Sequence, residues 1–181
     1  YKARLISPIR VNNGADFLQR FLPEFEKAEE KFGVPKEIIA AIIGIESSYG
    51  SITGRERVID SLSTLAFDYP RRSNFFTKQL EHFLLLAREE KLDAFSMKGS
   101  YAGAMGYGQF IPSSYRSYAI DFDNDGIRNI VTNPVDAIGS VANYLSKHGW
   151  EKNALIAEAL ERNDVTSDFK TSLTVSYTHL R

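Results

Sequence analysis

The chain has 181 residues, of which 43% are hydrophobic and 25% are charged, and its formal net charge is −1. This length and composition predict one packed domain, and the near-neutral charge argues against a nucleic-acid-binding protein, which would normally be strongly basic. The absence of cysteine excludes disulfides, thiolate catalysis and zinc–thiolate sites, and no run of about 18 apolar residues exists that would span a membrane.

The first predicted helix covers residues 16–32. Apolar residues recur in it at helical spacing, namely Phe17, Phe21, Phe25, Ala28 and Phe32. Pro23 is expected to kink this helix or to mark its true start, and Gly33 is expected to end it. Residues 1–15 before it are predicted to be an irregular lead-in with a turn at Asn12-Asn13-Gly14.

The next segment, residues 35–47, is predicted to be a buried helix because it is apolar almost all round. One apolar stripe of this helix ends in Glu46, so a carboxylate lies at the end of an apolar face. Burial raises the pKa of a carboxyl group, and an acid that keeps its proton near neutral pH can donate it to a leaving group. The alternative is an ordinary helix-end carboxylate that pairs with an arginine or points to water.

Two further helices are predicted after a polar loop at 51–58. The first covers 60–69 with Asp60 as its N-cap. The second covers 73–90, and its buried stripe is expected to consist of Phe76, Leu80, Phe83, Leu84 and Ala87.

Arginines and histidines give weaker signals. Arg71 and Arg72 lie in the connection between these two helices and are interpreted as solvent-exposed, with bidentate binding of a substrate carboxylate as the alternative. His82 is interpreted as a surface residue, and His148 and His179 lack the spacing of a metal site.

Four glycines fall within the ten residues 99–108, which indicates unusual backbone dihedrals or close approach to a ligand. The order of these glycines is not that of a phosphate-binding loop. Ser100, Tyr107 and Gln109 are polar groups on this constrained backbone, so the segment is suited to line a cleft and bind hydroxyl and amide groups. A tight structural loop is an equally good interpretation.

Asp121, Asp123 and Asp125 alternate along the chain and are followed by Gly126, as in the first half of an EF-hand calcium loop. Alternate oxygen ligands converge on one cation, and oxygen ligands alone favour Ca²⁺ over zinc or copper. The twelfth position is threonine instead of glutamate, so Asp136 is expected to close the site. The alternative is a polar turn without a metal.

A helix is predicted to begin at Asn133-Pro134, with asparagine as the cap and proline at the first position. It is expected to end at His148-Gly149. Its apolar face consists of Val135, Ile138, Val141, Ala142 and Leu145. Tyr144 beside this face belongs either to the core or to a cleft, and a last helix is predicted at about 152–163.

Three segments carry a resemblance to a known family: Glu46-Ser-Ser-Tyr-Gly50, residues 99–110 (GSYAGAMGYGQF) and residues 133–144 (NPVDAIGSVANY). Over most of residues 5–150 the chain resembles the membrane-bound lytic murein transglycosylase B family. The resemblance implies a mainly α fold, with a lysozyme-like helical core, a satellite helical subdomain and an EF-hand-like calcium loop. It also implies cleavage of the β-1,4 bond between N-acetylmuramic acid and N-acetylglucosamine in peptidoglycan, with formation of 1,6-anhydromuramic ends and no consumption of water.

The family's functional residues can be placed by position. The resemblance implies that Glu46 is the sole catalytic acid/base and that Ser100 lies near its carboxylate. Substrate contacts are implied at Met105, Tyr107, Gln109 and Tyr144, and on the peptide side of the substrate at Arg71 and Arg72. The implied calcium ligands are the carboxylates of Asp121, Asp123, Asp125 and Asp136 and the backbone carbonyl of Ile127, with one more residue between Asp125 and Asp136 than the family pattern has. No organic cofactor is implied.

The resemblance implies a single transglycosylase domain over 1–181. Its parts are a core at about 33–150, an EF-hand-like loop at 121–136 and a helical subdomain built from 1–32 and 151–170. The family domain continues with a final core helix that bears a Tyr-Asn pair, so its C-terminal part is expected to be missing or replaced here. The expected partner is the glycan strands of peptidoglycan, bound by a monomer without a membrane span and without nucleic acid. The location implied by this substrate is the periplasm or the periplasmic face of the outer membrane. This location follows from the substrate alone, because the sequence shows no signal-peptide pattern.

Two other functions are compatible with the motifs. One is a lysozyme-like muramidase that hydrolyses the glycan with Asp60 or Asp68 as a second carboxylate, which would leave reducing sugar ends. The other is a non-catalytic, calcium-stabilised peptidoglycan-binding module, in which replacing Glu46 would change nothing.

Overall fold

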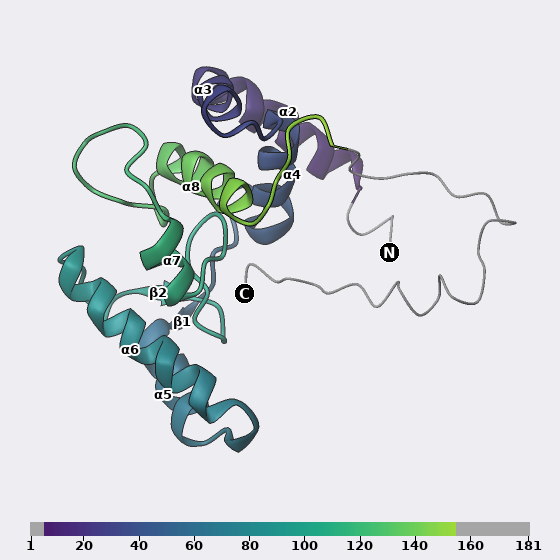
Figure 1. The fold of residues 1–181 in the computed structure, drawn as a ribbon. Helices are drawn as coiled ribbons and strands as arrows, with labels where there is room; N and C mark the ends of the chain where they lie inside the picture. Colours follow the sequence, from purple (N-terminus) through teal and green to yellow (C-terminus); the bar gives the residue numbers. More distant parts are fainter. Residues whose placement is uncertain (1–5, 155–181) are drawn as a thin grey trace, which may run out of the picture.

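The computed structural model of the chain describes residues 6–154 (Figure 1). Within them the fold is mainly helical, as predicted, with seven α-helices, one 3-10 turn and two strands of two residues each. The helical elements are α2 (Pro8–Arg20), α3 (Leu22–Phe32), α4 (Lys36–Ser47), α5 (Val58–Phe67), η1 (Pro70–Arg72), α6 (Ser73–Glu89), α7 (Pro112–Tyr118) and α8 (Pro134–Lys147), and the strands are β1 (Glu56–Arg57) and β2 (Lys98–Gly99).

The N-terminal helix begins much earlier than predicted. Ser7 caps α2, because its side chain accepts a hydrogen bond from the backbone N–H of Arg10 at 3.3 Å, and Pro8 suits the first turn. The segment Asn12-Asn13-Gly14 therefore lies inside a helix, and the predicted turn there is wrong. The predicted role of Pro23 is confirmed, since it lies in the first turn of a separate helix, α3.

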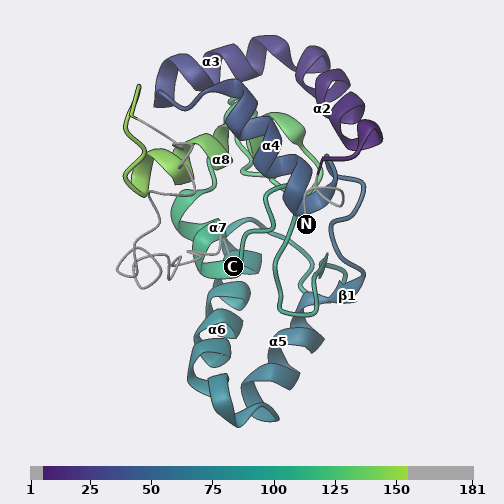
Figure 2. The same ribbon diagram turned by 90° about the vertical axis from the view of Figure 1, so that its right-hand side faces the viewer.

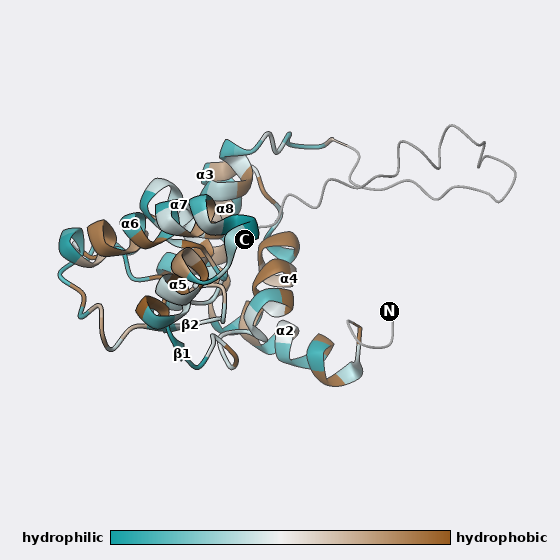
Figure 3. Cartoon of the chain, turned by 90° about the horizontal axis from the view of Figure 1, so that it is seen from below, coloured by the Kyte–Doolittle hydropathy of each residue, from teal (hydrophilic) through white to brown (hydrophobic). Residues whose placement is uncertain are grey.

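Helix α4 runs through one half of the molecule and contacts α2, α3 and α8 (Figure 2). Its fully buried side chains include Ile39 and Ile43, each of which contributes about 1.5–3 kcal/mol by leaving water. Ile45, however, is 54% exposed, so the predicted burial holds for one face of the helix and not for its whole circumference. The apolar colouring of α4 beside the more polar α2 is visible in Figure 3.

Helices α5 and α6 form a hairpin that projects from the opposite half (Figures 1 and 2). Asp60 is not the cap of α5, because the helix begins at Val58, and its carboxylate pairs with Arg57 at 2.6 Å. The predicted stripe of α6 is also partly wrong: Leu84 is 48% exposed, and the fully buried Leu86 lies in the core instead.

The stripe of α6 was misplaced because a polar residue belongs to it. Gln79 is 5% exposed, and its side-chain oxygen accepts a hydrogen bond from the N–H of Ser113 at 3.0 Å. Burial of a polar group is tolerated when it is hydrogen-bonded. The buried residues of α6 are therefore Phe76, Gln79, Phe83, Leu86 and Ala87.

The short strands β1 and β2 and the short helix α7 were not predicted. Strands β1 and β2 pair antiparallel, with Glu56 opposite Gly99, and they are too short to show an alternating pattern. Helix α7 begins at Pro112 and buries Tyr115, whose hydroxyl donates a hydrogen bond to the carbonyl of Arg128 at 2.6 Å. Burial raises the pKa of Tyr115 to about 12, so this hydroxyl keeps its proton.

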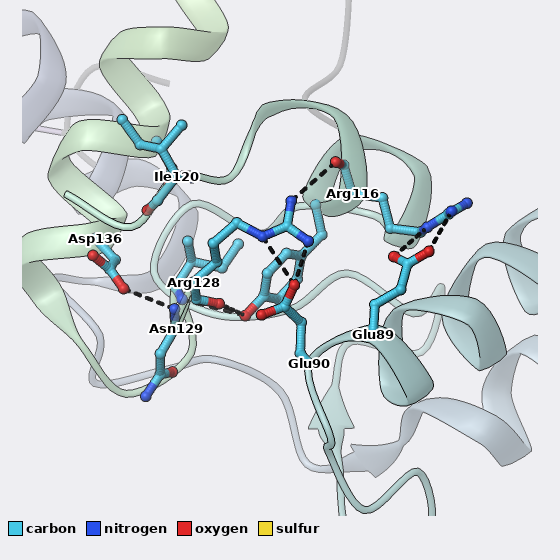
Figure 4. A network of polar contacts seen from close by, with 10 residues as sticks. Glu89, Glu90, Arg116, Ile120, Arg128, Asn129 and Asp136 are labelled. Atoms are coloured by element: carbon cyan, nitrogen blue, oxygen red, sulfur yellow. Dashed lines mark hydrogen bonds and ion pairs between the residues drawn. The ribbon is translucent and has the colours of Figure 1, made fainter. Parts of the chain in front are cut away.

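Ion pairs connect the α5–α6 hairpin to the rest of the chain (Figure 4). Arg116 of α7 binds both carboxylate oxygens of Glu89 at 2.7 and 2.9 Å, and Arg128 pairs with Glu90. The hydrogen bond from Arg116 lowers the pKa of Glu89. His82 is half-buried and its Nδ1 lies 2.7 Å from Arg116, so it is part of this network and not an isolated surface histidine.

Within residues 6–154 no helix combines the length and the apolar character that a bilayer span requires. Of the last predicted helix, at about 152–163, the structure describes residues 152–154, where Lys152 and Asn153 form a turn and Ala154 is not helical. Its remainder lies outside the described residues, as does the part of the predicted subdomain after residue 154.

Candidate functional site

Glu46 is the penultimate residue of α4 and is half-buried. The helix ends at Ser47, and the chain then continues through three residues with positive φ, namely Ser48 at 49°, Tyr49 at 58° and Gly50 at 83°. Residues other than glycine are strained in this region, so such a turn persists only where its surroundings hold it. The carboxylate therefore lies at a helix end whose backbone is tightly specified.

The glycine-rich segment packs directly against this turn. A Cβ atom placed on Gly50 would lie 2.2 Å from the ring of Tyr107, and one placed on Gly106 would lie 2.2 Å from the carbonyl oxygen of Ile130. Gly106 also has a φ of 72°. The unusual dihedral predicted for this segment is confirmed at Gly106. The close approaches at Gly50 and Gly106 are made by the chain itself, so the predicted close approach to a ligand stays a prediction.

Tyr107 and Gln109 are both fixed to the turn after α4. The carbonyl oxygen of Tyr107 accepts a hydrogen bond from Ser47 Oγ at 2.7 Å, and its half-buried ring stacks on Phe17 with centroids 6.2 Å apart. Gln109 is 7% exposed, and its Nε2 donates to the carbonyl oxygen of Thr53 at 3.1 Å. The structure thus brings these two predicted site residues to the helix end that carries Glu46.

Ser47 was missed by the sequence analysis, although a signal for it was present. It follows Ile39 and Ile43 at a spacing of four residues, so it lies on the buried stripe of α4, where it is 1% exposed. A polar residue in such a stripe must find hydrogen-bond partners inside the protein.

Ser100 and Met105 organise the glycine-rich segment. Ser100 is half-buried, and its Oγ accepts hydrogen bonds from the N–H groups of Ala102 and Ala104 at 3.3 and 3.1 Å. Met105 is fully buried and forms a two-way backbone bridge with Phe110. The Met105 side chain lies in the core of the described residues, so its predicted contact with a glycan stays a prediction.

Tyr144 lies at 8% exposure inside an aromatic cluster on α8. His148 stacks on it with ring centroids 3.9 Å apart, and Phe110 and Tyr118 lie at 5.6 and 5.1 Å. Burial raises the pKa of Tyr144. Of the two positions that the sequence left open, the structure favours the core.

Arg71 and Arg72 are exposed on η1, as interpreted from the sequence. The guanidinium carbon of Arg72 lies 4.1 Å from the centre of the Phe75 ring, a cation–π geometry. Arg72 also lines a cavity of about 470 Å³ between the α5–α6 hairpin and the glycine-rich segment. The other lining residues are Leu65, Tyr69, Phe75, Phe76, Tyr101, Ala102 and Ile111. A mostly apolar cavity with one cation suits a ligand with an apolar part and an anionic group.

The predicted EF-hand-like loop at 121–136, called the acidic loop below, brings three of its four predicted carboxylates close together. Oxygen atoms of Asp121, Asp123 and Asp136 all lie within 4.8 Å of one another. The carboxylate of Asp125 is outside this group and accepts a hydrogen bond from the N–H of Ile127 at 2.8 Å. The predicted closing residue, Asp136, therefore lies in the cluster, whereas the Asp125 carboxylate does not, and all the predicted ligands stay predictions as ligands of a cation.

The electrostatics of this cluster fit a hard cation. Asp136 is fully buried, and this burial raises its pKa, although its oxygens accept hydrogen bonds from the N–H groups of Phe122 and Asn129 at 2.7 Å each. The carboxylate of Asp123 raises it further. Three converging carboxylates, one of them buried, supply oxygen atoms of the kind that Ca²⁺ takes as ligands.

The far end of the acidic loop reaches the glycine-rich segment. The N–H of Tyr107 donates to the carbonyl oxygen of Ile130 at 3.1 Å, and the N–H of Asn129 next to it donates to Asp136 (Figure 4). The acidic loop and the end of α4 therefore contact the same residue, Tyr107.

The site described so far is a half-buried acid at a rigid helix end, beside a glycine-rich segment in a helical fold. The profile of the transglycosylase SLT domain matches residues 1–179. The chain is also 47% identical over 178 residues to membrane-bound lytic murein transglycosylase B of Escherichia coli (strain K12), which covers 97% of this chain and 49% of that protein. It thus spans about half the length of this curated relative.

Solved structures share the fold. The soluble lytic transglycosylase SltB1 from Pseudomonas aeruginosa is 53% identical with a TM-score of 0.85, over 86% of this chain and 52% of that one. The Escherichia coli lytic transglycosylase Slt35, in complex with calcium, is 50% identical with a TM-score of 0.83, over 86% of this chain and 49% of that one. The chain therefore belongs to the transglycosylase SLT domain family.

Proposed function

We propose that the protein is a lytic transglycosylase that cleaves the β-1,4 bond between N-acetylmuramic acid and N-acetylglucosamine in peptidoglycan. The observation that carries this proposal is the half-buried Glu46 at the end of α4, next to Ser47, which is hydrogen-bonded to Tyr107, in a chain of the transglycosylase SLT domain family. The name of the Escherichia coli relative supports murein as the substrate.

In the proposed mechanism Glu46 acts twice. It first donates its proton to the glycosidic oxygen, and the bond to C1 of the muramyl residue breaks through an oxocarbenium-like state that the substrate's own N-acetyl group stabilises. The Glu46 carboxylate then accepts the proton of the muramyl C6 hydroxyl, whose oxygen bonds to C1. Attack from within the substrate benefits from proximity and needs no water.

The hydrolytic alternative requires a second carboxylate, and its two candidates are poorly suited to that role. Asp60 is exposed and its carboxylate is paired with Arg57. Asp68 is exposed at the C-terminal cap of α5. A single acid with an internal nucleophile therefore accounts better for these residues than a pair of carboxylates.

Digestion of purified sacculi distinguishes the two reactions. We expect muropeptides that end in 1,6-anhydromuramic acid, which are lighter by one water than the hydrolytic products, and mass spectrometry separates the two sets. Reducing ends in place of anhydro ends would contradict the proposal and support the muramidase.

We further propose that the acidic loop binds one structural Ca²⁺ through Asp121, Asp123 and Asp136, with Asp125 and the carbonyl of Ile127 as additional ligands. The convergence of three carboxylates supports this site, and the related Slt35 structure is described as a complex with calcium. The ion would neutralise the repulsion among these carboxylates and hold the loop that contacts Tyr107.

Calcium is expected to raise the melting temperature, because a ligand that binds only the folded state stabilises it. Ca²⁺ at a hundredfold excess over its dissociation constant contributes about 2.7 kcal/mol, which corresponds to about 5–10 °C for a domain of this size. Calorimetry with Ca²⁺ and with chelator measures the shift. Asp121→Asn should reduce it, and Asp16→Asn, an exposed aspartate on α2, should leave it intact. No shift in the unsubstituted protein would remove the metal from this proposal.

The remaining features of the proposal concern organisation and location. The protein acts as a monomer on glycan strands in the periplasm or at the periplasmic face of the outer membrane, and Arg71 and Arg72 face the peptide part of the substrate. The lysozyme-like core corresponds to residues of about 33–150, and α2 and α3 belong to the satellite subdomain.

A further inference from the structure

The last residue of α4 is a serine with an unusual number of contacts. Ser47 Oγ lies 2.7 Å from the carbonyl oxygen of Tyr107 and 3.1 Å from that of Ile43, and it accepts a hydrogen bond from the N–H of Gly50 at 3.0 Å. A hydroxyl has one proton to donate, and the shorter distance assigns it to Tyr107. The contact with Ile43, one turn earlier, is the ordinary alternative for a helical serine.

These bonds join two segments that are 60 residues apart in the chain. One is the end of α4 with Glu46, and the other is the glycine-rich segment with Tyr107. The same hydroxyl also holds Gly50, the last of the three residues with positive φ, and the carbonyl of Ser47 accepts the N–H of Ile52 at 2.8 Å. Ser47 thus fixes both the strained turn and its distance to Tyr107.

We propose that Ser47 is a positioning residue of the transglycosylase reaction, which holds the Glu46 carboxylate at a fixed position relative to Tyr107 of the glycine-rich segment. This inference rests on the proposed function, because it takes Glu46 as the acid. Ser47 is 1% exposed, so a substrate cannot reach it and it acts only through Glu46 and Tyr107. A catalytic carboxylate must keep its place within about 0.5 Å, and a displacement of about 1 Å costs about a hundredfold in rate.

The test is Ser47→Ala in the whole protein, with kcat and KM measured on soluble peptidoglycan glycan strands well below the melting temperature. We expect kcat to fall about 10- to 100-fold, whereas KM changes by less than about threefold because no substrate contact is removed. A kcat within about twofold of the unsubstituted protein would overturn the proposal, as would a loss confined to KM.

Ser140→Ala is the matched control. Ser140 of α8 is also 1% exposed, and its Oγ accepts a hydrogen bond from the N–H of Ile120 at 2.9 Å. The control should lose stability but keep kcat. An equal fall of kcat in both variants would assign the effect to destabilisation and overturn the proposal.

A second variant covers the case in which Ser47→Ala does not fold. Ser47→Cys retains a weaker hydrogen-bonding group, and it creates no intramolecular disulfide because the sequence has no other cysteine. Its kcat should be reduced beyond that of Ser140→Ala, and an unchanged kcat would contradict the proposal. If the unsubstituted protein forms no anhydro ends, the proposed function itself fails, which is a different result from activity that survives the loss of the Ser47 hydroxyl.

Discussion

Replacing Glu46 by glutamine is expected to lower the rate of anhydro-end formation by about 10²–10⁴-fold, the usual contribution of a general acid–base group. Glutamine keeps the size and shape of the side chain but has no proton to transfer at neutral pH. Because Glu46 is half-buried at the end of α4 and glutamine fills the same space, the melting temperature and the binding to sacculi should change little. Release of muropeptides measures the first effect, and co-sedimentation with sacculi the second.

Glu37→Gln is the control on the same helix. Glu37 lies in the first turn of α4, is exposed, and is 3.8 Å from Lys36, so its loss should leave turnover unchanged. A Glu46→Gln protein with full turnover would rule out this residue as the acid. If the unsubstituted protein and the Glu46→Gln variant both bind sacculi but neither has turnover, the non-catalytic binding module is the better description.

Gly106→Ala is expected to destabilise the protein by about 2–5 kcal/mol. Its φ of 72° costs a residue with a Cβ atom about 1–2 kcal/mol, and the Cβ would lie 2.2 Å from the carbonyl oxygen of Ile130, which adds about 1–3 kcal/mol of overpacking. The melting temperature should fall by about 10 °C. Activity should fall with it, because the hydrogen bond between Tyr107 and Ile130 lies at the same contact.

Gly126→Ala separates the two causes. Gly126 has a φ of 92° and no atom within 4 Å of the position of a Cβ, so its substitution costs only the dihedral part, about 1–2 kcal/mol. Thermal unfolding of both variants without calcium measures the difference. If both lose the same stability, steric contact with Ile130 is not what requires glycine at position 106.

Elements with strong local signals could be predicted from the sequence. Helix α8 has its cap at Asn133 and its proline at the first position, and α4 has a continuous apolar pattern, so both were located to within one or two residues. The start of α2 was missed because its cap, Ser7, is followed by only a weak apolar pattern and by Asn12-Asn13-Gly14, which favour turns in isolation. Packing of the helix outweighs that local preference.

Sequence motifs point to the residues of the candidate site but not to the contacts between them. Glu46 and the glycine-rich segment have motif signals, whereas the bond between Ser47 and Tyr107 links residues 60 positions apart and leaves no periodic trace. The same holds for the pair Arg128–Glu90 and for the burial of Met105. Such contacts depend on how the helices pack against one another, and the local pattern of residues along the chain does not encode that packing.

The backbone of Ile130 has a consequence for anyone who would exchange the acidic loop for that of another protein. Its carbonyl oxygen serves Tyr107, and its N–H lies 3.4 Å from the Tyr115 hydroxyl, so the outgoing end of the loop is also a support for two other segments. Residues 121–132 therefore cannot be exchanged without changing the hydrogen bonds to these two segments. A transplanted loop with better ion affinity but a differently placed exit would shift Tyr107, which is bonded to the end of α4. We therefore expect such an exchange to lower activity even when the loop binds its ion.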